Sequence, residues 1–166
     1  MVGCPETTCK IISKNESKIN SMHINIRLAK KSDIPSIFNI RTSVKENHLS
    51  LEQLEEIGVT HETIEKVIFE EPCIWIALVN DQPVGFSMAD SNEGCVFAAF
   101  VIPAYEGIGL GRLLMQKAEV YLFNDFKKIW LETAKNSRAE GFYKKLGWIA
   151  TKSLSNGDIR FEKYQN

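Results

Sequence analysis

The sequence predicts a mixed α/β fold of the α+β type, in which helices flank a mostly antiparallel, twisted sheet. Short apolar runs with strand character follow one another along the chain and are joined by tight turns, which favours antiparallel neighbours. Other segments repeat apolar residues at the spacing of an amphipathic helix. The expected order of elements is roughly β-α-α-β-β-β-α-β-α-β-β, which is typical of this class.

Length and composition indicate one domain. The 166 residues suit a single domain with a substantial core, expected over residues 23–166 after a flexible polar leader over residues 1–22. The net charge of −1, without a block of basic residues, argues against a nucleic-acid partner. No apolar run is long enough to cross a bilayer, and the N-terminus lacks the apolar core of a signal peptide. We therefore expect a cytoplasmic protein with no membrane partner.

The four cysteines form neither a disulfide framework nor a metal site by their spacing. Cys4 and Cys9 lie in the leader, too loosely spaced for a usual zinc knuckle and without a second ligand pair. Cys73 and Cys95 begin apolar runs, so we expect them to be buried and unreactive. No metal is expected.

In the first half of the chain, one strand precedes the helical segments. Capping residues mark where each helix begins. The expected elements are a strand at 24–28, a helix that starts after Ser32 or Asp33, a short helix with a capping box from Ser50 and Gln53, and helical spacing over 60–69.

The second half alternates strands with two longer helices. Turn residues and a glycine terminator set the boundaries. The expected elements are strands at 73–79 and 84–88 joined by a hairpin, a turn at 92–94, a strand at 95–102, a helix with Leu110, Leu113, Leu114 and Ala118 on one face, a strand at 129–134, a helix with a capping box from Ser137 and Glu140 that ends at Gly147, and strands at 148–153 and 159–164 around Asn156 and Gly157.

The most informative segment joins the strand that stops at Pro103 to the long helix. Gly107, Gly109 and Gly111 stand at alternate positions between them. Glycine lets the backbone come close to a ligand, and the first turn of a helix offers unpaired N–H groups and a positive dipole end. We therefore expect a phosphorylated ligand here.

The glycine spacing separates the known kinds of phosphate loop. A dinucleotide-binding turn needs G-x-G-x-x-G within a βαβ repeat, and this segment has G-x-G-x-G after a series of strands. A nucleotide P-loop needs Lys and then Ser or Thr after its last glycine, whereas Arg112 and Leu113 follow here. A turn built only for tight packing is the remaining alternative, and three glycines at a helix start are costly for it.

Two motifs resemble those of a known family. Residues 101–111, which read VIPAYEGIGLG, resemble the acetyl-CoA-binding signature of the GNAT N-acetyltransferase superfamily. Residues 136–148, which read NSRAEGFYKKLGW, are similar to its second hallmark. The resemblance covers nearly the whole chain after the leader. It implies a GNAT-like fold and transfer of an acetyl group from acetyl-CoA to a primary amine of a small molecule, peptide or protein, by direct attack in a ternary complex.

The resemblance also implies which residues contact acetyl-CoA. Backbone N–H groups of the glycine segment would hold the diphosphate, an N–H of the preceding strand would polarise the thioester carbonyl, and an asparagine would bind the pantetheine arm. These residues are Ala99, Phe100, Val101, Glu106, Gly107, Ile108, Gly109, Leu110, Gly111, Arg112, Asn136 and Tyr143. Glu106 departs from the usual Arg or Gln, and we expect Arg112 or a lysine to pair with it.

Acetyl transfer needs an acid for the departing thiolate and a base for the attacking amine. By the resemblance, Tyr143 takes the family's general-acid position, and its ordinary pKa near 10, above that of a thiol, suits that role. A core tyrosine on the helix stripe would explain its spacing equally well. Glu132 is a candidate base for the acceptor amine, with Glu46 and His48 as alternatives, and each would otherwise be an ordinary surface residue. His23 and His61 are expected at the surface.

Two other functions remain open. A non-catalytic acyl-CoA-binding sensor or regulatory module would need the same glycine segment, and an interaction domain without a ligand would need neither motif. The sequence does not identify the acceptor, although residues 39–69 are expected to shape its pocket. Edge strands near the C-terminus could pair between two copies in a homodimer.

Overall fold

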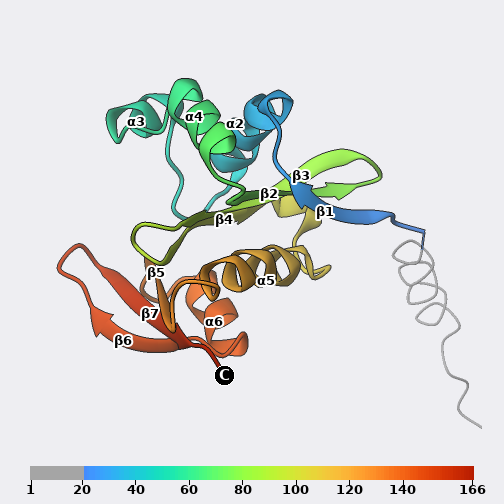
Figure 1. The fold of residues 1–166 in the computed structure, drawn as a ribbon. Helices are drawn as coiled ribbons and strands as arrows, with labels where there is room; N and C mark the ends of the chain where they lie inside the picture. Colours follow the sequence, from blue (N-terminus) through green and yellow to red (C-terminus); the bar gives the residue numbers. More distant parts are fainter. Residues whose placement is uncertain (1–20) are drawn as a thin grey trace, which may run out of the picture.

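A computed structural model describes residues 21–166 and contains one seven-stranded sheet with helices on both faces (Figure 1). The expected leader, with Cys4 and Cys9, lies almost wholly outside the described residues. The strands are β1 (Ile24–Leu28), β2 (Ile74–Val79), β3 (Gln82–Asp90), β4 (Cys95–Val101), β5 (Lys128–Ala134), β6 (Ile149–Ser153) and β7 (Asp158–Tyr164). The helices are α2 (Ile34–Ser43), α3 (Leu51–Glu56), α4 (His61–Glu70), α5 (Leu110–Leu122) and α6 (Arg138–Lys145), with short 3-10 turns η1 (Lys31–Asp33) and η2 (Pro103–Tyr105).

The strand order in the sheet is β1-β2-β3-β4-β5-β7-β6. Every neighbouring pair is antiparallel except β4 and β5, which are parallel and are registered only at Cys95 and Trp130. Beyond that point, residues 96–101 of β4 have no strand partner on their β5 side within the described part of the chain. The mixed, mostly antiparallel sheet predicted from the sequence is confirmed.

Two details of the helices differ from expectation. Three helices, not two, lie between β1 and β2, because the segments after Ser50 and Thr60 form separate helices, each with its own capping box. The capping box expected before α6 is only half present. Ser137 Oγ accepts from Glu140 N at 3.2 Å, but the Glu140 carboxylate accepts from Asn136 N at 2.6 Å. The N–H of Ser137 already donates to the Ala134 carbonyl, so it is not available to the carboxylate.

The core lies on both sides of β2, whose six residues are all buried. In Figure 1, α2, α3 and α4 cover one face of the sheet, while α5 and α6 cover the other. Helix α5 contributes the largest buried stripe: Leu110, Leu114, Met115, Ala118 and Leu122. Burial of these apolar side chains is the main source of stability in such a domain. It fixes α5, and therefore the glycine segment before it, against β3 and β4.

Cys73 and Cys95 are buried free thiols, as the sequence predicted. Burial raises the pKa of Cys73 to about 11 and that of Cys95 to about 12. Both thiols therefore stay protonated near neutral pH and are poor nucleophiles.

An ion pair fixes the connection between β1 and α2. Asp33 is buried and accepts from Arg27 Nη1 at 2.6 Å, from Arg27 Nη2 at 2.9 Å and from the Lys30 N–H at 2.7 Å. These bonds, led by the Arg27 guanidinium, lower the pKa of Asp33. Asp33 is the residue before α2, as expected, but its side chain makes no capping bond to α2 and instead accepts from the Lys30 N–H at the start of η1.

We predict that Asp33→Asn lowers the free energy of unfolding at pH 7 by about 1–3 kcal/mol, because Arg27 loses its charged partner. The pKa of Asp33 is lower in the folded chain than the value near 3.9 of an unfolded one. Its stabilisation is therefore complete above about pH 5 and is lost as the pH falls through the folded-state pKa. Urea unfolding of both proteins between pH 7 and pH 3 should show the difference shrinking in acid.

Asp125→Asn is the matched control, because Asp125 is exposed at the end of α5. It should leave the unfolding midpoint unchanged. A difference between Asp33→Asn and the parent protein that stays constant from pH 7 to pH 3 would show that Asp33 is not the titrating group.

Candidate active site

Glycine is required for two different structural reasons at the three positions before and within α5. Gly107 and Gly109 adopt φ values of 79° and 91°, which side chains rarely tolerate, and a Cβ on either would meet no atom within 4 Å. Gly111 has an ordinary φ, and its added Cβ would lie 3.1 Å from the ring tip of Phe142 in α6. The first two glycines therefore shape an open loop, and the third lets α6 pack closely on the start of α5.

The N-terminus of α5 is free of side-chain caps. Gly109 is its N-cap and offers no side chain, and the first helical hydrogen bond runs from Leu113 N to Gly109 O at 3.2 Å. The N–H groups before Leu113 have no partner within the helix, and the helix dipole is positive here. Leu110 is buried and Ile108 packs against the core, so the loop is anchored while Arg112 stays exposed. This arrangement suits a phosphate group.

Glu106 is paired with Arg138 and not, as the sequence suggested, with Arg112 or a lysine. Arg138 Nη2 lies 2.8 Å from Glu106 Oε2, and both side chains are well exposed. Arg138 is the first residue of α6, which packs on the start of α5 and so brings its guanidinium to the glycine loop. The negative charge that departs from the family pattern is thus balanced from another element.

The same end of α6 contacts the loop after α2. The Glu46 carboxylate accepts from the Arg138 N–H at 3.1 Å, although 92 residues separate the two. His48 approaches only the nearby Val44 carbonyl, at 3.2 Å. The Glu46 carboxylate therefore accepts a hydrogen bond from the first turn of α6. Neither Glu46 nor His48, the two alternative bases, makes a hydrogen bond with another candidate catalytic side chain among the described residues.

Tyr143 lies within the core, where its ring packs edge-on against Phe142 and Trp148 and near Phe161. Burial raises the pKa of Tyr143 to about 12. Its hydroxyl makes no hydrogen bond with the described part of the chain. The core position expected from the helix stripe is therefore present, and the hydroxyl remains free to donate.

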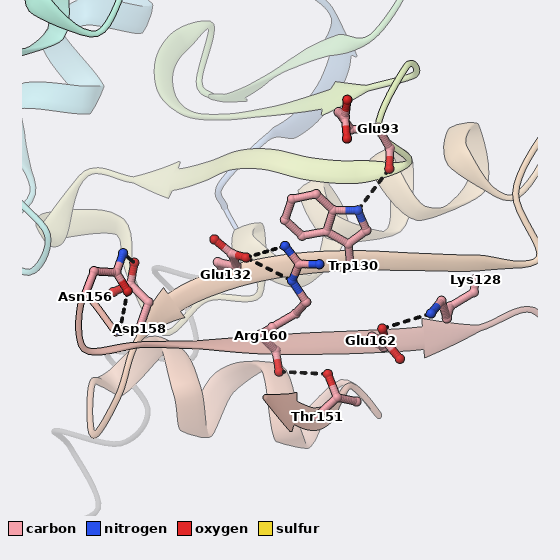
Figure 2. A network of polar contacts seen from close by, with 9 residues as sticks. All are labelled: Glu93, Lys128, Trp130, Glu132, Thr151, Asn156, Asp158, Arg160 and Glu162. Atoms are coloured by element: carbon pink, nitrogen blue, oxygen red, sulfur yellow. Dashed lines mark hydrogen bonds and ion pairs between the residues drawn. The ribbon is translucent and has the colours of Figure 1, made fainter. Parts of the chain in front are cut away.

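Glu132 on β5 is held by Arg160 on β7, as Figure 2 shows. Arg160 Nε and Nη2 donate to Glu132 Oε1 at 2.9 and 2.6 Å, and the guanidinium lies 3.9 Å from the centroid of the Trp130 ring. Trp130 Nε1 in turn donates to the Glu93 carbonyl at 2.9 Å. One carboxylate oxygen of Glu132 is thus occupied, while Oε2 has no bond to residues 21–166.

The remaining expected ligands lie along β4 and before α6. Ala99, Phe100 and Val101 are partly buried and pair with β3, so they border the side of β4 that β5 leaves unpaired. Asn136 is exposed in the turn between β5 and α6, with a φ of 63°. Because Gly111 contacts Phe142, the helix that carries Tyr143 lies beside the glycine loop.

A cavity of about 170 Å³ lies between α2, α3, α4 and the sheet. Apart from Arg41 and Asn47, it is lined by apolar residues: Ile37, Phe38, Leu49, Leu54, Ile57, Val59, Ile64, Phe86, Met88, Phe97, Ala98 and Phe100. The sequence predicted that residues 39–69 shape an acceptor pocket, but it did not single out Arg41 as a pocket residue. The helical spacing could have shown that Arg41 is buried, because it lies four residues after Ile37 and therefore on the same face of α2.

Residues 21–166 contain no group of three or more His, Cys, Asp or Glu side chains that could hold a metal ion. Over the same residues, no helix is both long and apolar enough to cross a membrane.

Comparisons with known sequences find N-acetyltransferases among the similar proteins. A peptidyl-lysine N-acetyltransferase, YjaB, from Salmonella typhimurium is 29% identical over 132 residues, which are 78% of this chain and 86% of that protein. The ribosomal protein bS18 alanine N-acetyltransferase of Haemophilus influenzae is 31% identical over 72 residues, 42% of this chain and 49% of that protein.

Solved structures show the same fold. The PaiA N-acetyltransferase of Thermoplasma acidophilum, solved with coenzyme A, superposes with a TM-score of 0.70 at 17% identity and covers 86% of this chain and 99% of its own. A putative streptothricin acetyltransferase of Bacillus anthracis, solved with acetyl-CoA, gives 0.63 at 20% identity and covers 86% and 100%. Residues 34–148 match the model of the acetyltransferase (GNAT) family. The chain belongs to the acetyltransferase (GNAT) family.

Proposed function

We propose that this acetyltransferase uses acetyl-CoA to acetylate a primary amine of a small molecule, peptide or protein, and that the amine attacks directly in a ternary complex in the cytoplasm. The observation that carries the proposal is the open glycine loop at the uncapped N-terminus of α5, next to the unpaired side of β4. The relatives named for peptidyl-lysine and ribosomal alanine acetylation support an amine acceptor.

The residues present fit the donor. Acetyl-CoA would supply the acetyl group as a thioester. Backbone N–H groups of residues 107–112 are suited to its diphosphate, because the loop is open around Gly107 and Gly109. An N–H from residues 99–101 is available on the β5-facing side of β4 to polarise the thioester carbonyl. The exposed Asn136 amide is placed to bind the pantetheine arm.

Tyr143 would protonate the departing thiolate. With a pKa of about 12, its hydroxyl keeps its proton throughout the physiological range and has no competing acceptor in the described chain. The neighbouring rings fix its position without using its proton. Its deep packing equally favours the second candidate function, a non-catalytic acyl-CoA sensor in which Tyr143 only fills the core.

Glu132 would accept the proton of the attacking amine through Oε2, since Oε1 is bound by Arg160. The stacked Arg160 and Trp130 restrict the rotation of the carboxylate and so position it on the strand next to β4.

Arg138→Gln should raise the dissociation constant of acetyl-CoA about two- to fivefold, because the exposed Glu106 carboxylate would then stand unpaired beside the bound diphosphate. The double variant Glu106→Gln with Arg138→Gln should recover most of the affinity. Isothermal titration with acetyl-CoA measures both. Lys66→Gln removes an exposed positive charge from α4 and is the control. Equal affinities in all four proteins would exclude a role for the pair, and a parent protein that does not bind acetyl-CoA would reject the proposed function.

Tyr143→Phe should lower kcat about a hundredfold or more, while the affinity for acetyl-CoA stays unchanged. Tyr164→Phe is the matched control, because Tyr164 is exposed and its hydroxyl only contacts Glu162. Thiol release followed from pH 6 to pH 10 should show no loss of rate from ionisation of Tyr143, since its pKa of about 12 lies above that range. An unchanged kcat in Tyr143→Phe would favour the sensor.

Glu132→Gln should lower kcat/KM for the amine about a hundredfold, with the largest loss at acidic pH, where fewer acceptor molecules are neutral. Arg160→Gln breaks the same ion pair but keeps the carboxylate, so it should retain more activity. Glu162→Gln, which removes the neighbouring Lys128 pair, is the control. If Glu132→Gln and Arg160→Gln reduce the rate equally, the pair has a structural role and Glu132 is not the base.

A further inference from the structure

The cavity between α2, α3, α4 and the sheet holds a buried cation that has no anionic partner among residues 21–166. Arg41 is 8% exposed, and its Nη1 has no hydrogen-bond partner among residues 21–166. Among the described residues that line the cavity, none is acidic and Asn47 is the only other polar one. Burial lowers the pKa of Arg41, with no opposing charge to raise it.

A buried guanidinium without a hydrogen-bond acceptor destabilises the fold unless a ligand supplies the acceptor. Arginine is rarely buried without a partner, and an unpaired buried charge is costly because it has lost its hydration. The Phe100 ring lies 4.3 Å from Arg41 Cζ, so a cation–π contact covers one face of the guanidinium. That contact uses the flat face and leaves the N–H donors at the edge, where Nη1 is unpaired. The donors at the edge therefore need an acceptor.

The chemistry of the donor set indicates a carboxylate. The planar fork of a guanidinium matches the two oxygens of a carboxylate, and the charge assists both hydrogen bonds. A phosphate dianion fits less well, because the cavity provides one cation for two negative charges. The rest of the lining is aromatic and aliphatic and suits an apolar group. A cavity of about 170 Å³ is close to the size that accommodates a benzene ring.

The cavity adjoins the site of the proposed reaction. Ala98 and Phe100 line it and belong to β4, the strand whose neighbouring N–H groups would polarise the thioester. An occupant that places an apolar group in the cavity therefore lies against the strand at which acetyl transfer would occur. Glu46 and Asn47 belong to the loop that borders both the cavity and the start of α6.

We infer that the acceptor is an amine that carries its own carboxylate and a compact apolar side chain, and that Arg41 binds the carboxylate. This rests on the proposed acetyl transfer. An apolar amino acid is the simplest such acceptor. Its nitrogen forms the new bond to the acetyl carbon as the carbon–sulfur bond breaks. Its proton passes to the base, and the thiolate is protonated, so the products are an N-acetyl amino acid and CoA.

A binding experiment tests the carboxylate site without any transfer. Phenylacetate and phenylacetamide have the same ring and differ in charge, and each is titrated into the whole protein by calorimetry. Phenylacetate should bind at least about tenfold more tightly than the amide, because a charged hydrogen-bonded pair is lost with the amide. Equal affinities, or no binding of phenylacetate, would overturn the inference.

The variant Arg41→Met identifies the residue responsible. It should abolish the preference for phenylacetate and should fold, because methionine fills similar space without a buried unpaired charge. Its melting temperature is expected to equal or exceed that of the parent. Lys66→Met, which removes an exposed cation on α4, is the matched control and should keep the preference. A preference that persists in Arg41→Met would overturn the assignment to this residue.

Activity then separates this inference from the proposed function. With acetyl-CoA, phenylalanine should be acetylated at least about tenfold more efficiently than phenylalaninamide, and Arg41→Met should remove that difference. A dipeptide such as alanyl-phenylalanine distinguishes a peptide C-terminus from a free amino acid as the source of the carboxylate. If the amide is the better substrate, the inference fails and the proposed function stands. If acetyl-CoA does not bind, the proposed function fails, while the phenylacetate titration still decides the role of Arg41.

Discussion

The single registered pair between Cys95 and Trp130 is the constraint on which the rest of the structure depends. It joins the two halves of the sheet, and it is reinforced because both the backbone and the indole N–H of Trp130 donate to carbonyls of the turn before β4. Arg160 covers the other side of the indole. Since β4 and β5 are held at this end alone, the remainder of β4 keeps one unpaired side. A parallel pair held at one end gives a folded protein a stable strand with free backbone groups.

Helices α5 and α6, which flank this junction, bring together charged residues that are far apart in the sequence. Helix α5 is fixed by its buried stripe, and α6 packs on its first turn because Gly111 has no side chain. Arg138 thereby meets Glu106 from the glycine loop and, through its backbone, Glu46 from the loop after α2. The glycine loop, the second motif and the loop bordering the cavity thus converge on one residue. Changes at any of these elements are therefore expected to influence the others.

The sequence predicted the local elements well because their signals are local. Hairpin turns, the capping box of Ser50 and Gln53 and the stripe of α5 depend on residues a few positions apart, and the structure confirms them. Long-range pairings were less predictable. The choice of Arg138 as the partner of Glu106, and the use of the Ser137 N–H by the Ala134 carbonyl, depend on how α6 sits against its neighbours. No spacing rule in the chain specifies either contact.

Arg41 shows how a buried polar group indicates function more directly than a motif does. A folded chain usually satisfies its buried donors, so an exception has to be maintained by some other requirement. Stability alone would favour methionine or leucine at this position on the buried face of α2. The hydroxyl of Tyr143 also lacks a partner within the described residues, in the helix beside the glycine loop. If Arg41 were only structural, an apolar residue would serve better at its position. The proposed ligands would give both groups a partner: an anionic acceptor for Arg41 and a departing thiolate for Tyr143.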